Sequence, residues 1–194
     1  MVGKMATQPN LLMSVGQYME LLESSDVRYE YWDGEVVAMA GASLRHNQIT
    51  MNIGGLAWQQ LRGKDCSAAQ SDQLVKAESN QRYLFPDVVI HCKQGRIEQT
   101  FVEAVLDPVV VFEVLSPSTE RIDRTKKFES YSKIASLKEL VLVSQDRQIV
   151  EHFYRESASE DWRVEHLFED EHELELQSVG CKFQVRDIYE GVEW

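Results

Sequence analysis

The stretch Pro108-Val-Val-Val-Phe-Glu-Val-Leu115 decides the fold, because it is apolar at nearly every position. An apolar run of this length predicts a central strand that is covered on both faces. Ser118-Thr119-Glu120-Arg121 resembles a helix start, and an amphipathic pattern continues to about Ala135. The next apolar run, Glu139-Leu-Val-Leu-Val143, predicts a second strand. Strand, helix and strand together predict a right-handed parallel crossover.

The rest of the chain adds helices and strands to this unit. Ser14 is placed to cap a helix that ends at about Glu23, and Asp33-Gly34 between two β-prone runs predicts a hairpin over 28–39. Apolar spacing over 44–61 predicts a second helix, in which Gly54-Gly55 indicates a close packing contact. Further β-prone stretches lie at 67–76, 82–92, 148–154, 162–168 and about 174–176. We expect an α/β fold, with a mixed central β-sheet flanked by helices and an N-terminal helix and β-hairpin.

Length and composition indicate one domain. The 194 residues are 43% hydrophobic, which is enough for a core, and no internal repeat or linker interrupts them. We expect a core over about 13–155, peripheral strands over 156–194 and a flexible segment over 1–12. No apolar run approaches the roughly 18 residues of a membrane helix, so we expect a cytoplasmic protein with no membrane partner.

The formal net charge of −12 makes unaided adhesion to nucleic acid or anionic lipid unfavourable. Acidic residues gather in 151–175, whereas basic residues outnumber acidic ones in 117–138. A polyanionic partner is therefore expected to contact the helix that follows the central strand. The three cysteines, Cys66, Cys92 and Cys181, are far apart and form no CxxC pair. They predict neither a disulfide framework nor a zinc site, and we expect small buried apolar side chains.

Two acidic residues interrupt apolar strands. Glu113 lies inside the central run, and Asp87 lies in Leu84-Phe-Pro-Asp-Val-Val-Ile90. An ionised carboxylate in apolar surroundings costs several kcal/mol without a partner, so these acids need a cation. If the two strands are neighbours and both side chains share a face, they form an oxygen site of the kind that holds Mg²⁺.

A lysine is the third element of this site, and helical geometry selects Lys127. Phe128, Tyr131, Ile134 and Ala135 define the apolar face of the helix after the central strand. At about 100° per residue, Lys127 lies about 40° from the centre of this face, and Lys126 about 140° away. Lys127 therefore points toward the sheet, where its charge could steady an attacking water or a transition state.

These residues resemble the Uma-two family of restriction endonucleases, within the PD-(D/E)xK nuclease superfamily. The resemblance covers roughly residues 13–155. It rests on Pro86-Asp87, Phe112-Glu-Val-Leu-Ser-Pro-Ser-Thr119, Asp123-Arg-Thr-Lys-Lys127 and Tyr131, and on the earlier Arg28-Tyr-Glu-Tyr-Trp-Asp-Gly-Glu35 and Arg45-His46. It implies a restriction-endonuclease-like fold in which Asp87 and Glu113 are the metal ligands.

The sequence departs from the superfamily pattern at one position. Leu115 stands two residues after Glu113, where the superfamily usually has its lysine. The resemblance implies that Lys127 supplies this lysine from the helix, and leaves Glu30 and Glu35 both open as the first acid. His46, Asp123 and Tyr131 are candidate supporting residues, and the candidates for phosphate contact are Arg121, Arg124 and Lys126.

We therefore expect a Mg²⁺-dependent endonuclease that hydrolyses DNA, with Mn²⁺ able to substitute. Because the chain as a whole repels phosphate, binding is expected to be sensitive to salt and to benefit from a homodimer that pools two basic patches. A catalytically idle module that binds nucleic acid or a protein partner is the alternative. A third reading is an antitoxin-like protein that binds its partner through the acidic 151–175 face.

Overall fold

The computed structural model describes residues 12–39, 41–77, 81–99, 102–117 and 120–194. All but Leu12 of the segment predicted to be flexible lies outside the described residues, as do Ser118 and Thr119 of the predicted helix start. No helix within these described ranges is long and apolar enough to cross a bilayer.

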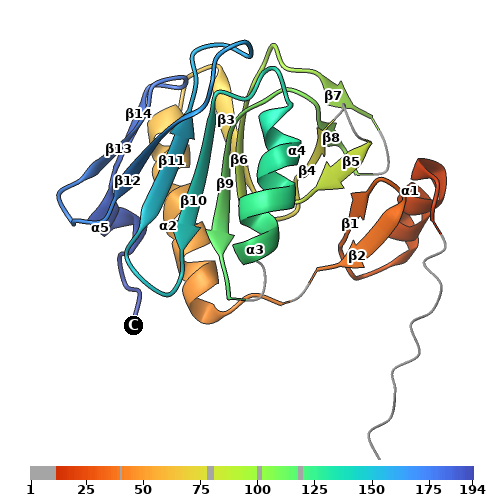
Figure 1. Cartoon of the computed structure of the whole chain (residues 1–194), viewed down its shortest axis with the longest axis horizontal. Coiled ribbons are helices and arrows are strands. Elements are labelled where there is room, and N and C mark those ends of the chain that lie inside the picture. Colours follow the sequence, from red (N-terminus) through yellow and green to blue (C-terminus); the bar gives the residue numbers. More distant parts are fainter. Residues whose placement is uncertain (1–11, 40, 78–80, 100–101, 118–119) are drawn as a thin grey trace, which may run out of the picture.

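The central sheet has the predicted apolar strand in its middle (Figure 1). Its order is β12-β11-β10-β9-β6-β3, and seven of the eight residues of β9 are buried. β9 pairs in parallel with β10 and antiparallel with β6, which confirms the parallel crossover. The bounds are β3 (Cys66–Gln70), β6 (Val88–Cys92), β9 (Pro108–Leu115), β10 (Glu139–Ser144), β11 (Val150–Tyr154) and β12 (Arg163–Leu167).

A second sheet carries the N-terminal hairpin, in the order β2-β1-β5-β4-β8-β7. Asp33 and Gly34 join β1 to β2 with φ angles of 51° and 105°, so the predicted hairpin is confirmed. α1 (Val15–Ser24) begins after its predicted cap, Ser14, and packs on this sheet in a shared apolar cluster. The bounds are β1 (Tyr29–Trp32), β2 (Glu35–Ala38), β4 (Leu74–Ala77), β5 (Arg82–Leu84), β7 (Ile97–Glu98) and β8 (Ala104–Val105).

Two β-prone stretches divide between the sheets. Residues 67–76 separate into β3 and β4, and residues 82–92 into β5 and β6. The first break contains Ser71, whose φ is 48°. The second contains Pro86, which has no N–H to donate to a ladder. This second break places Asp87 where the chain passes from one sheet to the other.

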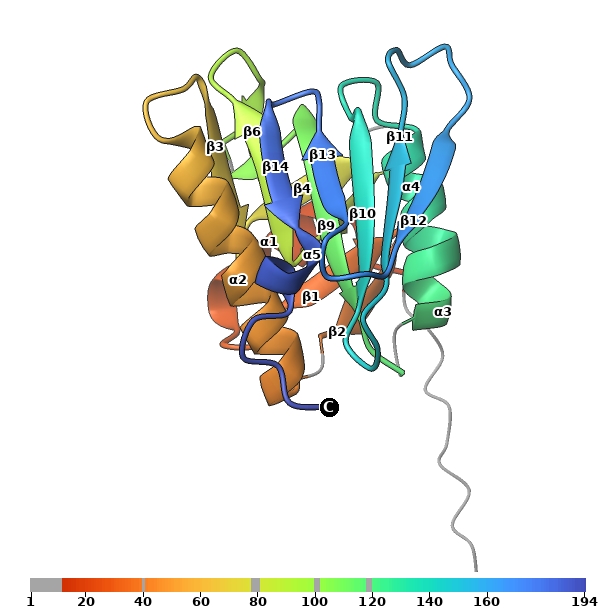
Figure 2. The same cartoon turned by 90° about the vertical axis from the view of Figure 1, so that its left-hand side faces the viewer.

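Helices cover both faces of the central sheet (Figure 2). One face packs on α2 (Leu44–Leu61), α5 (Val185–Ile188) and a two-stranded sheet of β13 (Glu173–Leu176) and β14 (Cys181–Gln184). The other packs on a continuous helix made of α3 (Glu120–Ile122), the π-helical segment Asp123–Lys127 and α4 (Phe128–Ser132). The sequence pattern predicted the longer helices but missed the short strands β7, β8 and β14 and the short helix α5.

Gly54 allows α2 to lie close to β3. A Cβ atom added at Gly54 would stand 2.1 Å from Nε2 of Gln70. That amide nitrogen donates to the Thr50 carbonyl at 2.7 Å, which fixes the Gln70 side chain. A Cβ atom at Gly55 would meet nothing within 4 Å. The predicted close contact is confirmed for Gly54 and wrong for Gly55.

The prediction that the cysteines form no disulfide is wrong. Cys66 and Cys92 are bonded to each other, and they are direct partners in the antiparallel register of β3 and β6. Both are half-buried, whereas Cys181 is a buried free thiol, as expected. Sequence spacing failed here because a cross-strand disulfide needs only matching register, which leaves no local motif.

Candidate active site

Asp87 is held at the edge of the central sheet by two donors. Val88 pairs with Phe112, so Asp87 stands opposite Glu113 on the neighbouring strand. Its Oδ2 accepts a hydrogen bond from the backbone N–H of Val114 at 2.7 Å, and its Oδ1 lies 2.8 Å from Nε2 of His46. His46 comes from the first turn of α2. The two predicted metal ligands therefore lie next to each other, Glu113 on β9 and Asp87 directly before its neighbour β6.

The carboxylate of Glu113 is paired with a buried cation, Lys127, as its position inside an apolar strand predicts. The Nζ atom of Lys127 lies 3.1 Å from both Oε1 and Oε2 of Glu113. The hydroxyl of Tyr131 donates to Oε1 at 2.7 Å. All three side chains are almost fully buried. Lys127 thus points toward the sheet, in agreement with the helical geometry derived from the sequence.

Two more carboxylates surround the same ammonium. Oε1 of Glu30, from β1 of the hairpin, lies 3.1 Å from Nζ of Lys127. Oδ1 of Asp123, one turn earlier in the π-helical segment, lies 3.5 Å away. π-helical turns are rare and often mark functional sites. Of the two candidate first acids, the structure brings Glu30 to the site and leaves Glu35 exposed at the start of β2.

Burial and charge shift the proton affinities of these groups in definite directions. Burial raises the pKa of Glu113 well above its usual value, against the opposing charge of Lys127. Burial acts to lower the pKa of Lys127, but the neighbouring carboxylates raise it well above its usual value. Burial and the carboxylate of Glu113 raise the pKa of Tyr131. Lys127 is therefore an ammonium at neutral pH, and Tyr131 keeps the proton that it donates.

The buried cluster carries more negative than positive charge. Glu30, Glu113 and Asp123 surround one ammonium, and the charge of Asp87 also acts on Glu113. Such an excess favours proton uptake or a further cation. Carboxylate oxygens suit Mg²⁺, which commonly binds one or two of them together with water and phosphate. Asp87 and Glu113 fit this donor set, although the described ranges contain no group of three or more His, Cys, Asp or Glu side chains arranged for a metal ion.

The predicted phosphate contacts separate into two kinds. Arg121 and Lys126 are exposed on the helix that follows β9. Arg124 instead forms a bidentate pair with Glu151 and a further contact with Glu120, so its guanidinium is already bound by carboxylates. Leu115 is buried in the apolar cluster beneath α4, so no cation stands at the usual strand position.

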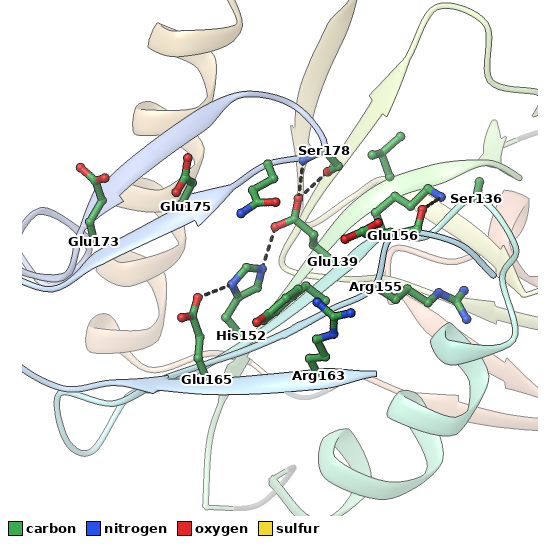
Figure 3. Close-up of a pocket in the computed structure, with 14 residues that line it drawn as sticks. Ser136, Glu139, His152, Arg155, Glu156, Arg163, Glu165, Glu173, Glu175 and Ser178 are labelled. Atoms are coloured by element: carbon green, nitrogen blue, oxygen red, sulfur yellow. Dashed lines mark hydrogen bonds and ion pairs between the residues drawn. The ribbon is translucent and has the colours of Figure 1, made fainter. Parts of the chain in front are cut away.

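A second buried polar network lies on the opposite face of β10, in a cavity of about 720 Å³ (Figure 3). His152 contacts Glu139 through Nε2 at 2.6 Å and Glu165 through Nδ1 at 2.8 Å. Glu139 also accepts from the backbone N–H of Ser178 at 2.9 Å. The sequence reading passed over this network, although Glu139 opens an apolar strand and could have been flagged by the argument used for Glu113.

A comparison with solved structures defines the class of fold. The crystal structure of "a putative nuclease belonging to DUF820" from Anabaena variabilis matches with a TM-score of 0.75 over 93% of this chain and 99% of that chain, at 14% sequence identity. The chain thus has the mixed α/β, restriction-endonuclease-like fold that the sequence predicted.

The family follows from the sequence comparisons. The sequence model of the Uma2 (Uma-two) family, described as "Putative restriction endonuclease", matches residues 15–186, and the chain belongs to this family. The protein slr1290 of Synechocystis sp. is 32% identical over 192 residues, which cover 99% of each chain. The protein sll1609 of the same organism is 27% identical over 165 residues, 85% of this chain and 93% of its own. Both relatives are named as uncharacterized proteins. Membership of this family indicates a nuclease-like function.

Proposed function

We propose that the protein is a Mg²⁺-dependent endonuclease that hydrolyses phosphodiester bonds in DNA. One observation carries the proposal: Asp87, directly before β6, and Glu113, on the neighbouring strand β9, lie beside the buried ammonium of Lys127. Membership of the Uma2 family supports the same chemistry. Mn²⁺ also accepts oxygen donors and is expected to substitute for Mg²⁺.

Each side chain has a distinct task in this mechanism. Asp87 and Glu113 would hold the metal ion, which when bound polarises the scissile phosphate and lowers the pKa of a water molecule. His46 and the Val114 amide fix the two oxygens of Asp87, and Tyr131 fixes Glu113. Because its pKa is raised, Lys127 serves as a positive charge that stabilises the phosphorane-like transition state, and not as a proton acceptor.

DNA would approach over the helix after β9. Arg121 and Lys126 are its exposed cations on this helix, whereas the Arg124 guanidinium is bound by carboxylates. With a net charge of −12, the protein is expected to bind DNA weakly and with strong dependence on salt. A homodimer would double the number of these cations. Sedimentation velocity tests whether the protein forms one.

The first experiment is nicking of supercoiled plasmid in Mg²⁺, Mn²⁺ or EDTA. The wild type is compared with Glu113→Ala and Lys127→Ala, and Lys93→Ala serves as the control because it removes an exposed lysine that follows β6, at the end of that strand away from Asp87. Metal-dependent nicking that is lost in the first two variants and kept in the control supports the mechanism. Equal nicking in EDTA, or none by a folded wild type, would reject it.

A catalytically idle binding module is the second candidate. It is favoured by the contact of Lys127 with both oxygens of Glu113, because a closed buried ion network can be purely structural. Such a module would bind its partner equally in EDTA and Mg²⁺ and would yield no cleavage product with any metal.

A further inference from the structure

A separate cavity opens at the edge of the sheet where β9 and β10 end. Its volume is about 630 Å³, within the range of small-molecule sites. Its walls are the start of α2, the turn after β10 and residues 191–194. Figures 1 and 2 show the end of β9, the lower end of α2 and the C-terminus gathered at this edge.

Residues in the walls of this cavity are close to the candidate active site along the chain. Arg45 in its wall directly precedes His46, which contacts Asp87 at 2.8 Å. On the other side, the backbone N–H of Gln145 donates to the carbonyl of Leu115 at 3.2 Å, two residues beyond Glu113. Asp87 is therefore linked to one cavity wall through the side chain of His46, and Glu113 to the other through Leu115 and its hydrogen bond with Gln145.

Gln145 presents an unused donor to this cavity. The backbone N–H of His46 donates to Oγ of Ser43 at 3.1 Å, so the Ser43 hydroxyl proton is free to donate to Oε1 of Gln145 at 2.6 Å. This chain of bonds sets the orientation of the carboxamide. Its Nε2 has no hydrogen-bond partner among the residues described, and Gln145 is only 7% exposed. This nitrogen stays accessible from the cavity that Gln145 lines, so it can donate to a ligand that accepts there.

The other walls suit a phosphate and a base. Arg45 is half-buried and forms no ion pair within the described ranges, and the first turn of α2 contains no acidic residue. Helix N-termini favour anions through their free N–H groups. Trp194 is 55% exposed and its ring lies 5.4 Å from that of Tyr189, which makes it a supported stacking surface.

Two acidic residues in the cavity wall oppose the binding of an anion. Asp146 and Glu193 also line the cavity, and both are exposed. Their charge opposes a free phosphate ion, so a ligand needs an additional contact. Stacking of a base on Trp194 supplies one, and is worth about 1–3 kcal/mol per base.

We propose that this cavity binds one unpaired nucleotide of the DNA strand that enters the active site. Its phosphate would accept from Nε2 of Gln145 and from Arg45, and its base would stack on Trp194. The inference rests on the proposed nuclease function. It adds that the protein prefers DNA in which the nucleotide bound in this cavity is unpaired, because a base stacked on Trp194 has left the duplex.

The test is fluorescence anisotropy of a labelled single-stranded DNA oligonucleotide, measured in EDTA so that cleavage plays no part. Trp194→Ala removes the stacking surface, and Trp58→Ala is its matched control because Trp58 is 62% exposed near the other end of α2. Gln145→Glu keeps the acceptor for Ser43 and replaces the free donor with a carboxylate oxygen. Melting temperatures verify that each variant folds.

We expect Trp194→Ala to weaken binding roughly 5- to 150-fold, Gln145→Glu to weaken it at least tenfold, and Trp58→Ala to leave it unchanged. This result supports the site even if plasmid nicking fails, in which case only the nuclease proposal falls. Equal binding by all folded variants, no binding by the wild type, or equal affinity for the matching duplex overturns the site and leaves a positive nicking result intact.

Discussion

Replacing Lys127 with methionine tests the charge balance of the site most directly. The Nζ atom of Lys127 lies within 3.5 Å of carboxylate oxygens from Glu30, Glu113 and Asp123, and the lysine is 7% exposed. Methionine keeps most of the side-chain volume but leaves these acids without their cation. Breaking a buried pair in this way typically costs about 3–5 kcal/mol. In a chain of this size the melting temperature should fall by roughly 6–20 °C.

Thermal melts with and without millimolar MgCl2 separate charge from packing. We expect Mg²⁺ to raise the melting temperature of Lys127→Met more than that of the wild type, because a ligand that binds only the folded state stabilises it. Adding Asp87→Asn should remove this gain. The fall in melting temperature that Lys127→Met causes should also be smaller at pH 5 than at pH 8. Burial raises the pKa of Glu113, so the folded state binds more protons and gains stability as the pH falls.

Lys126→Met is the matched control, because it removes an exposed lysine from the same π-helical segment. It should change stability by no more than about 0.5 kcal/mol. The reasoning fails if Lys127→Met melts within 2 °C of the wild type. A loss that neither pH nor Mg²⁺ alters would mean that Lys127 acts through packing, and the excess of buried carboxylate charge would then not favour a metal ion.

Three further predictions concern stability. Gly54→Ala should cost about 1–3 kcal/mol by displacing the fixed Gln70 amide, whereas Gly55→Ala should gain up to about 1 kcal/mol, and urea unfolding distinguishes them. Burial acts to lower the pKa of His152, but its hydrogen bonds to two glutamates raise it above 6.5. Its contribution to stability is therefore complete below about pH 6.5 and lost as the pH rises through the folded-state pKa, and His152→Gln should abolish that part of the pH dependence of the melting temperature. Reduction of the disulfide, which spans 26 residues of sequence, should cost up to roughly 3–4 kcal/mol. Reductant should therefore lower the melting temperature of the wild type and leave that of Cys66→Ser unchanged.

The parts of the fold that depend on local pattern were predictable. The run 108–115 became β9, the Asp33-Gly34 turn joined a hairpin, and the helix over 44–61 has the predicted bounds. The division of 67–76 and 82–92 between two sheets was not predictable in the same way. Strand propensity is continuous across each break, and only the tertiary pairing of the halves separates them.

The candidate site was predictable where a single residue contradicted its surroundings. A carboxylate inside an apolar strand requires a partner, and this argument found Glu113, Asp87 and Lys127. It could not choose between Glu30 and Glu35, because the two are five residues apart in one hairpin and only the docking of that hairpin distinguishes them. It also missed Gln145, because the meaning of a glutamine after a strand depends on the Ser43 hydroxyl across the cavity.

The placement of the lysine on a helix makes the site depend on how separate parts of the fold meet. A lysine at position 115 would share one rigid strand with Glu113, whereas Lys127 reaches the same carboxylate from the helix packed above it. The same Nζ atom contacts Glu30 of the second sheet. Arg82 reinforces that junction, because it donates to Asp33 of the hairpin turn and, at 2.8 Å, to Oγ of Ser130 in α4. The ammonium therefore lies where the central sheet, the hairpin and the helix join, so its charge is compensated only when all three have docked. This dependence gives a physical reason for keeping so many buried charges in one place: they favour the docked arrangement over alternatives in which an apolar surface would pack equally well.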